Sequence, residues 1–412
     1  MNVLVLRYSG YWYGPLLARA PQLYLVATDA EVARIPRERL AAFRFVYRTS
    51  SYDSLEELSA VAADLDARGV RIDRIASPTE YTQYAAGYLG QLLNVPHLSV
   101  HAALGTRDKR VMKRWAQDAG LAVPRWFSVP ALATEPDADE VIAATGLPLV
   151  LKPANGWGAT STTRIDDRDQ LAAALSDYAF DDELRSHHLI AEEFVDGVEM
   201  HIDAVWHDGT PWLFTVSRYF KPLLRQWNEG GLNGSFVLPR HDHPDLYRRL
   251  LKYNTTLNKA LGVVNGATHL ESFIEASSGR ILLTEMASRL AGGNLSEMIG
   301  AHCGVDLREV WAHELVDGAV EDLLFREGDY PYVGMLNLTP SISGTITELP
   351  DELALNAHPN VIAVSNVLAV GDLVSLTNPS SWCTMLVIGA ETEDALVAAA
   401  EELNRTFVVR VA

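Results

Sequence analysis

Short apolar runs alternate with helical stretches over the first 104 residues, and this alternation restricts the fold of the chain more than any other feature. Four runs predict strands, and Ser54–Arg68 predicts a helix that opens with a capping box of Ser54 and Glu57. Strands that alternate with helices indicate a mostly parallel sheet covered by helices. Gly10 and Gly14 follow the first run without forming GxGxxG, so a dinucleotide-binding fingerprint is absent there. The predicted strands are Val3–Arg7, Leu23–Ala27, Phe43–Tyr47 and Ile72–Ala76.

Changes of periodicity divide the rest of the chain, and the whole is predicted to be α/β (α+β). A helix from about Thr106 to Ala119, with Thr106 as its N-cap residue, bridges to a second unit. Pro130–Ala138 predicts a linker or loop, and the last unit ends with a helix at Glu391–Leu403 and a strand at Thr406–Val411. The predicted units are residues 1–104, the bridging helix 105–123, 124–196, 197–335 and a β-rich unit 336–412.

The charge balance argues against several kinds of partner. With 34 basic and 53 acidic residues, the formal net charge is −19, which disfavours proteins that follow nucleic-acid phosphates or bind anionic membranes. No apolar run approaches the roughly 20 residues of a membrane span, and the first residues lack the pattern of a signal peptide. Cys303 and Cys383 lack metal-site or disulfide-framework spacing, which favours a reducing compartment. We therefore expect a cytoplasmic protein without nucleic-acid or membrane partners.

The first chemical motif is a lysine at the end of an apolar strand, followed by a loop of small residues. Lys152 ends the run that begins at Leu149, and Gly156 and Gly158 follow. Glycines let backbone N–H groups approach phosphate oxygens, and the lysine adds a compact positive charge. The lysine precedes the glycines, so the motif is not a P-loop. A flexible hairpin loop explains the same residues equally well.

Acidic residues on both sides of a glycine turn form the second motif. The apolar run at Leu189 ends in Glu192 and Glu193, and Glu199 follows the turn at Gly197. The end of a buried strand can offer backbone groups to an adenine, and a carboxylate beyond the turn can accept ribose hydroxyls. Taken alone, however, this segment is more typical of an acidic surface turn.

The third motif is a predicted β-hairpin over His269–Met286. A three-residue loop Ser277–Gly279, with its glycine in the left-handed conformation, would pair Glu271 directly with Glu285. Opposed like charges are unfavourable, and a carboxylate pair among apolar neighbours needs a cation. Mg²⁺ bound by a few carboxylates and by nucleotide phosphates fits this pair. A register shifted by one residue would instead place the two carboxylates on opposite faces.

The fourth motif, Ser288–Leu295, directly follows the hairpin and contains Arg289, Gly292 and Gly293. The arginine could reach a transferring phosphate or a substrate carboxylate. The glycines would admit backbone donors at the start of the next helix. An arginine in a surface turn is an equal alternative.

In their order along the chain, these motifs resemble the ATP-grasp superfamily. The resemblance covers roughly residues 105–315, and Glu285–Gly293 is especially similar to the carboxylate–amine ligases, which include bacterial L-amino-acid ligases that make dipeptides. The resemblance implies an ATP-grasp fold. Its parts would be an N-terminal Rossmann-like parallel-sheet domain, a lid subdomain, a central antiparallel-sheet domain and a small C-terminal β-rich subdomain, matching the units above.

The resemblance also implies roles for individual residues. Arg289 and Lys152 would act in catalysis, and Glu271 and Glu285 would bind magnesium. Many members place an asparagine where this chain has Ala287, which puts in doubt how a second magnesium ion is held. The nucleotide-binding residues implied are Lys109 and Lys152 for the phosphates, Gly156, Gly158 and Ser161 in the lid, Glu192, Glu193 and Val195 at the adenine hinge, and Glu199 at the ribose.

The implied activity is ATP-dependent ligation of a carboxylate to an amine through an acyl phosphate, with ADP and phosphate as products. The implied cofactors are ATP and two Mg²⁺ ions, with Mn²⁺ as a substitute. The implied partners are ATP, small carboxylate and amine substrates such as amino acids or small peptides, and a second copy in a homodimer. The alternatives are an ATP-grasp carboxylase, a nucleotide-biosynthesis enzyme, and an ATP-binding protein without catalysis.

Several other polar residues are left outside the motifs. Lys113, Lys252 and Lys259 are predicted to lie on solvated helix faces. Lys221 and Arg225 could face a substrate, a phosphate or the solvent. His241 and His243 are attributed to a turn, His187 and His188 to a loop, and Trp227 and Asn233 to a substrate pocket.

Overall fold

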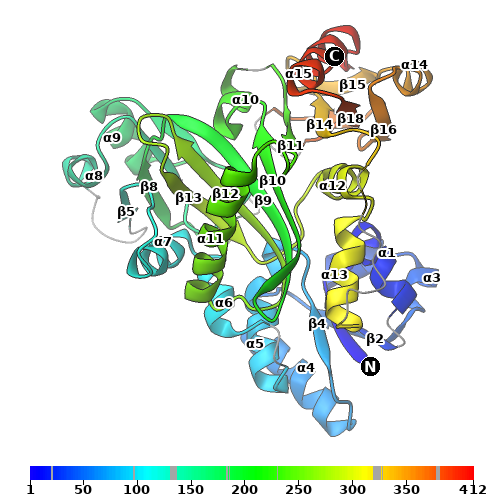
Figure 1. Ribbon diagram of the computed structural model, residues 1–412. Coiled ribbons are helices and arrows are strands. Elements are labelled where there is room, and N and C mark those ends of the chain that lie inside the picture. The colour runs from blue at the N-terminus through cyan, green and yellow to red at the C-terminus, as the bar shows by residue number, and fades with distance from the viewer. Residues whose placement is uncertain are drawn as a thin grey trace.

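The computed structural model describes residues 1–19, 22–95, 98–129, 137–181, 184, 186–229, 231–318, 326, 328–376 and 381–412, with the backbone alone at 227–229. Most of the predicted linker Pro130–Ala138 therefore lies outside the described residues. Figure 1 shows the arrangement of the helices and strands along the chain. No helix within the described ranges is long and apolar enough to cross a membrane.

The amino-terminal part is a parallel sheet, as predicted, and its four strands have the order β3-β2-β1-β4. Helices cover both faces, so β1 is buried on each: Val3 and Val5 pack toward α1, and Leu4 and Leu6 toward α4 and α5. The elements are β1 (Asn2–Leu6), α1 (Gly10–Arg19), β2 (Gln22–Thr28), α2 (Asp29–Arg34), α3 (Arg37–Leu40), β3 (Phe43–Thr49), α4 (Leu55–Ala67), β4 (Arg74–Ala76), the 3-10 helix η1 (Glu80–Thr82) and α5 (Gln83–Leu93).

Two predicted helix starts differ from the structure. Ser54 precedes α4, but its side chain makes no cap hydrogen bond, and the Glu57 carboxylate accepts from the Ser50 N–H and the Thr49 hydroxyl. Thr106 ends α6 (Val100–Gly105) rather than opening the bridging helix. That helix, α7 (Lys109–Asp118), is capped by Asp108, whose carboxylate accepts two backbone N–H groups. The aspartate is the better cap because its charge also complements the helix dipole.

A second, antiparallel sheet of order β5-β8-β6-β7, with two helices packed against it, lies in the unit predicted as a lid, and we call it the lid sheet. Its elements lie within the predicted unit 124–196. The elements are β5 (Trp126–Val129), α8 (Ala138–Thr145), β6 (Leu149–Pro153), β7 (Thr163–Ile165), α9 (Arg168–Ser176) and β8 (Leu189–Glu193).

The central sheet has eight antiparallel strands in the order β13-β12-β9-β10-β11-β14-β18-β16. Side chains alternate between its faces, so Ile202 packs toward α7 and α11, whereas Val205 packs toward α12 and α13. The elements are β9 (Gly197–His207), β10 (Thr210–Tyr219), α10 (Leu223–Glu229), β11 (Gly234–Val237), α11 (Pro244–Leu261), β12 (Gly266–Glu275), β13 (Ile281–Ala287), α12 (Leu295–Cys303), α13 (Leu307–Val316), β14 (Tyr332–Leu338), β16 (Val361–Asn366) and β18 (Thr384–Ala390).

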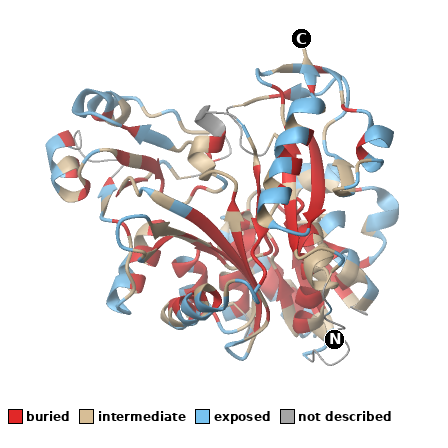
Figure 2. Cartoon of the chain, turned by 45° about the horizontal axis from the view of Figure 1, so that its top comes forward, coloured by how far each residue is buried: buried red, intermediate tan, exposed pale blue. Residues whose placement is uncertain are grey.

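The carboxyl-terminal part shares this sheet. The predicted boundary between residues 335 and 336 falls inside β14, and β16 and β18 extend the same sheet beyond it. A small sheet of order β17-β15-β19 and two helices complete the chain, and Figure 2 shows the buried residues concentrated on the central strands. These elements are β15 (Gly344–Glu348), α14 (Glu352–Asn356), β17 (Leu373–Val374), α15 (Glu393–Thr406) and β19 (Arg410–Val411).

Candidate active site

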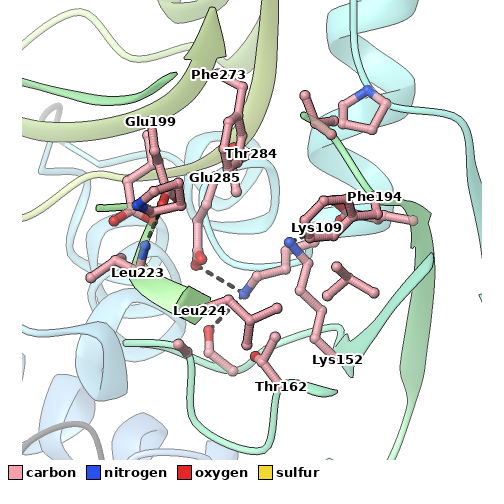
Figure 3. Close-up of a pocket in the computed structure, with 18 of the residues that line it drawn as sticks. Lys109, Lys152, Thr162, Phe194, Glu199, Leu223, Leu224, Phe273, Thr284 and Glu285 are labelled. Carbon is pink, nitrogen blue, oxygen red and sulfur yellow. Dashed lines mark hydrogen bonds and ion pairs between the residues drawn. The ribbon is translucent and has the colours of Figure 1, made fainter. Parts of the chain in front are cut away.

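A first cavity of about 930 Å³ lies between the lid sheet and the central sheet. Its walls come from β6, β8, β9, α10 and the β12–β13 hairpin, and Figure 3 shows side chains from both sheets pointing into it. The predicted nucleotide and metal residues that line it are Lys109, Lys152, Gly156, Glu192, Glu193, Val195, Glu199, Glu271 and Glu285.

Two lysines reach this cavity from different elements. The Lys109 ammonium donates to the Gly156 carbonyl at 2.7 Å and lies 2.9 Å from a Glu285 carboxylate oxygen (Figure 3). Lys152, at the end of β6, lies 3.1 Å from a Glu192 oxygen. Burial alone would lower the pKa of Lys152, but the carboxylates of Glu192 and Glu285 outweigh it and raise that pKa. Both lysines are therefore buried cations at the wall of the cavity.

Lys113 is not solvated, so the prediction for this residue is wrong. Its side chain is fully buried, and its ammonium lies 3.2 Å from a Glu192 oxygen and donates to the carbonyls of Leu283 and Thr284 at 2.8 and 3.2 Å. Burial lowers the pKa of Lys113 to about 8. Residues four apart share one helix face, so Lys113 lies on the same face of α7 as Lys109, and in the structure this face points inward. Lys252 and Lys259 are exposed, as predicted.

The glutamates of the predicted adenine hinge, Glu192 and Glu193, contact other charged side chains of the protein. The buried Glu192 carboxylate lies between Lys113 and Lys152, and the Glu193 carboxylate accepts from the backbone N–H and side chain of Arg125. Glu199 is buried and accepts from the Leu223 N–H at 2.6 Å. Burial, followed by the nearby Glu271 charge, raises the pKa of Glu199 to about 8.

The two predicted metal ligands, Glu271 and Glu285, are directly paired in the β12–β13 hairpin. The loop is one residue longer than predicted, because Glu275 pairs with Arg280, and Gly279 takes a φ of 67°. A bulge at Thr284 shifts the register back by one residue. The error in the loop is therefore cancelled, and the predicted pairing of the glutamates is confirmed.

The surroundings of this pair suit a magnesium ion. The Glu271 carboxylate accepts from the Tyr219 hydroxyl at 2.7 Å, and His269 Nε2 lies 3.6 Å away. Burial would raise the pKa of Glu271, but His269 and Tyr219 lower it to about 2, so the carboxylate is ionised. Two carboxylates that line both cavities could hold Mg²⁺ between them, with phosphate oxygens completing its coordination.

A second cavity of about 1250 Å³ lies on the other side of Glu271 and Glu285. Arg289 and Gly158 line this cavity rather than the first. Trp157 lines both cavities and lies in the loop that joins β6 to β7, residues 154–162, which we call the lid loop. Asn233 also lines the second cavity, whereas the side chain of Trp227 lies outside the described residues. Ser161 lines neither, and its hydroxyl accepts from the Asp181 N–H. The structure thus brings the predicted residues to two adjoining cavities, except for Ser161.

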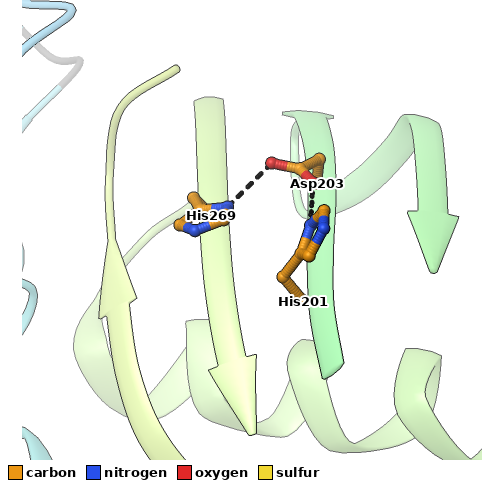
Figure 4. A group of neighbouring side chains, drawn as sticks. All are labelled: His201, Asp203 and His269. Atoms are coloured by element: carbon orange, nitrogen blue, oxygen red, sulfur yellow. Dashed lines mark hydrogen bonds and ion pairs between the residues drawn. The ribbon is translucent and has the colours of Figure 1, made fainter. Parts of the chain in front are cut away.

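Sequence reasoning missed the groups that position these residues. Glu80 follows β4 and lies 2.7 Å from the Arg289 guanidinium. His201, Asp203 and His269 form a buried chain in which each Asp203 oxygen contacts one imidazole, at 2.7 and 2.8 Å (Figure 4). Their ligand atoms lie within 4.8 Å of one another, as metal ligands could, but these hydrogen bonds already connect them. The sequence contained a signal for this cluster: His201 and Asp203 are two residues apart, and alternate residues of a strand share one sheet face. His269 lies opposite Asp203 on the neighbouring strand β12.

Residues 145–297 match the sequence profile of the family described as ATP-grasp domain. This part of the chain is an ATP-grasp domain. An L-arginine-specific L-amino acid ligase from Bacillus subtilis is 27% identical over 316 residues, which cover 75% of this chain and 73% of that protein. A D-alanine–D-alanine ligase from Cupriavidus taiwanensis is 36% identical over 138 residues, 33% of this chain and 40% of that one.

Solved structures with an ATP-grasp domain share the fold of the whole chain. An L-amino acid ligase from Bacillus licheniformis superposes with a TM-score of 0.77 and 15% identity, covering 100% of this chain and 98% of that one. A biotin carboxylase domain of 2-oxoglutarate carboxylase from Hydrogenobacter thermophilus was solved with MgADP and bicarbonate. It superposes with a TM-score of 0.65 and 12% identity, covering 99% of this chain and 90% of that one. The predicted ATP-grasp fold is therefore confirmed.

Proposed function

We propose that this protein is an ATP-dependent ligase that joins the carboxylate of one amino acid to the amine of another through an acyl phosphate. The observation that carries the proposal is the position of Glu271 and Glu285 on the wall shared by two cavities. Lys109 and Lys152 stand on one side of this wall, and Arg289 lines the cavity on the other. The L-amino acid ligase relative supports amino acids as the substrates.

In the first step, a carboxylate oxygen in the second cavity attacks the γ-phosphorus of ATP in the first. The bond to the bridging oxygen breaks, and ADP leaves. Lys109 and Lys152 would hold the phosphates, and Arg289 would neutralise charge on the transferring group, since phosphoryl transfer depends on positioning and charge stabilisation. Mg²⁺, when bound at Glu271 and Glu285, would supply further neutralisation of phosphate charge.

In the second step, an amine attacks the acyl carbon and phosphate leaves, with loss of one proton from the nitrogen. The protein's contribution here is to keep water out, because water would hydrolyse the acyl phosphate. Trp157, from the lid loop, lines both cavities and is placed to shield the reacting groups. A cytoplasmic location, a homodimer and the number of magnesium ions stay predictions.

An isotope experiment tests this reaction. The protein is incubated with MgATP and pairs of amino acids whose carboxylates carry ¹⁸O, and the products are analysed by mass spectrometry. We expect ADP, an amide product, and one ¹⁸O atom in the released phosphate. AMP and pyrophosphate, unlabelled phosphate, or ADP release that requires bicarbonate rather than an amine would overturn the proposal.

A further inference from the structure

We infer that the second cavity binds an amino acid with a large, uncharged, apolar side chain and excludes cationic side chains such as that of arginine. This inference rests on the proposed function and names the substrate class of that site. It differs from the arginine specificity in the name of the Bacillus subtilis relative.

Every charged side chain that lines the second cavity already has a partner of its own. Both Glu80 oxygens are occupied, one by Arg289 at 2.7 Å and the other by Arg107 at 3.3 Å. The charged lining residues and their other partners are Glu271 with Tyr219, Glu285 with Lys109, and His269 with Asp203. A substrate guanidinium would therefore meet no uncommitted carboxylate among the residues described around this cavity.

The rest of the wall is largely aromatic and aliphatic. These side chains come from separate parts of the chain: α1, the lid loop, the loop after β13, α12, β14 and the segment before β18. They are Trp12, Trp157, Leu290, Leu295, Met335 and Trp382. Such a surface gains free energy from a desolvated apolar group. Thr79, Gln226 and Asn233 also line the cavity, but they are uncharged and offer no opposite charge to a buried cation.

Two of these apolar side chains pack against the chain segment that carries Arg289. A Cβ atom on Gly292, three residues after the arginine, would lie 3.1 Å from the Trp382 ring, so that ring packs on the glycine backbone. A Cβ atom on Gly293 would lie 3.6 Å from the Met335 sulfur. A substrate whose carboxylate faces Arg289 and Glu285 thus has an apolar surface within reach of its side chain.

The test compares amino acids as substrates, using ADP release and product masses to obtain kcat/KM for each. We expect phenylalanine, leucine and methionine to exceed arginine, lysine and glutamate by about 100-fold or more, since unpaired polar groups are strongly discriminated in such sites. Arginine or lysine at the level of phenylalanine would overturn the inference while leaving the proposed function intact. No ADP release with any pair of amino acids would overturn both.

Variants of Trp382 and Met335 test whether the apolar wall of the second cavity sets this substrate selectivity. Trp382→Ala is expected to lower kcat/KM for phenylalanine at least 10-fold more than for alanine. Met335→Glu, which adds a carboxylate without a partner, should raise the arginine-to-phenylalanine ratio at least 10-fold. Trp212→Ala, which removes a ring outside both cavities, is the control and should leave these ratios unchanged. Unchanged ratios in both wall variants, with folding checked by thermal unfolding, would contradict the assignment.

Discussion

Arg289 and the buried Glu80 form an ion pair between the central sheet and the amino-terminal sheet, although 209 positions separate them in the sequence. The guanidinium contacts one Glu80 oxygen through both Nε and Nη2, at 2.8 and 2.7 Å. Burial would raise the pKa of Glu80, but Arg289 and Arg107 outweigh it and lower that pKa, so the carboxylate stays charged. Glu80, which follows strand β4 of the amino-terminal sheet, therefore orients the arginine that we place at the transferring phosphate.

Replacing Glu80 should impair catalysis without weakening nucleotide binding. In Glu80→Gln, Arg289 loses its charged partner, and we expect kcat to fall by about 10- to 100-fold, or roughly 1.4–2.8 kcal/mol of transition-state stabilisation. The KM for MgATP should change little, because Glu80 does not line the first cavity. Steady-state ADP release measures both constants. Glu348→Gln, in an exposed pair with Arg410, is the matched control, and an equal kcat in the two variants would contradict the positioning role.

The amino-terminal strands could be predicted from sequence because their apolar residues gather in short local runs that alternate with helical stretches. The pairing of Glu271 with Glu285 was also within reach, since a hairpin fixes register over few residues, although two deviations of one residue had to cancel. Contacts such as Arg289 with Glu80 depend on how separate domains pack, and no spacing in the sequence encodes that. The burial of Lys113 was missed because a lysine one helical turn from another usually indicates a solvated face.

Lys113 should be far more important for stability than an exposed lysine. In Lys113→Met, Glu192 keeps only Lys152 as a cationic partner and two backbone carbonyls lose their donor. Removing one member of a buried ion pair typically costs about 3–5 kcal/mol. We therefore expect a clear loss of unfolding free energy in a denaturant titration. Lys252→Met should stay within about 0.5 kcal/mol of the wild type, and similar losses in both variants would contradict the buried pair.

Removing the metal or one of its ligands should stop turnover and leave the fold intact. We expect Glu285→Ala to abolish ADP formation, because the remaining Glu271 carboxylate cannot hold the ion at the shared wall alone. Chelation of divalent ions should also stop ADP formation by the wild type. Added Mg²⁺ or Mn²⁺ should restore the activity of the chelated wild type but not that of Glu285→Ala. Circular dichroism and thermal unfolding check the fold. Full activity of Glu285→Ala, or of the wild type in excess chelator, would refute the metal assignment.

Glu314, on α13, should make stability depend on pH away from the active site. Its carboxylate is buried, one oxygen lies 3.2 Å from His207 Nδ1, and the other has no hydrogen-bond partner among the described residues. Burial raises the pKa of Glu314 to about 7, so the folded protein binds more protons than the unfolded chain between about pH 4.5 and 7. Its contribution to stability therefore falls as pH rises through this window, by on the order of 3 kcal/mol at about 1.4 kcal/mol per pKa unit. Glu314→Gln removes the titration, so it should unfold at a higher temperature than the wild type at pH 8, with a smaller difference at pH 5. Thermal unfolding of both proteins at pH 5 and pH 8 measures this difference in unfolding temperature. An equal difference at the two pH values would show that the Glu314 carboxyl does not titrate between them.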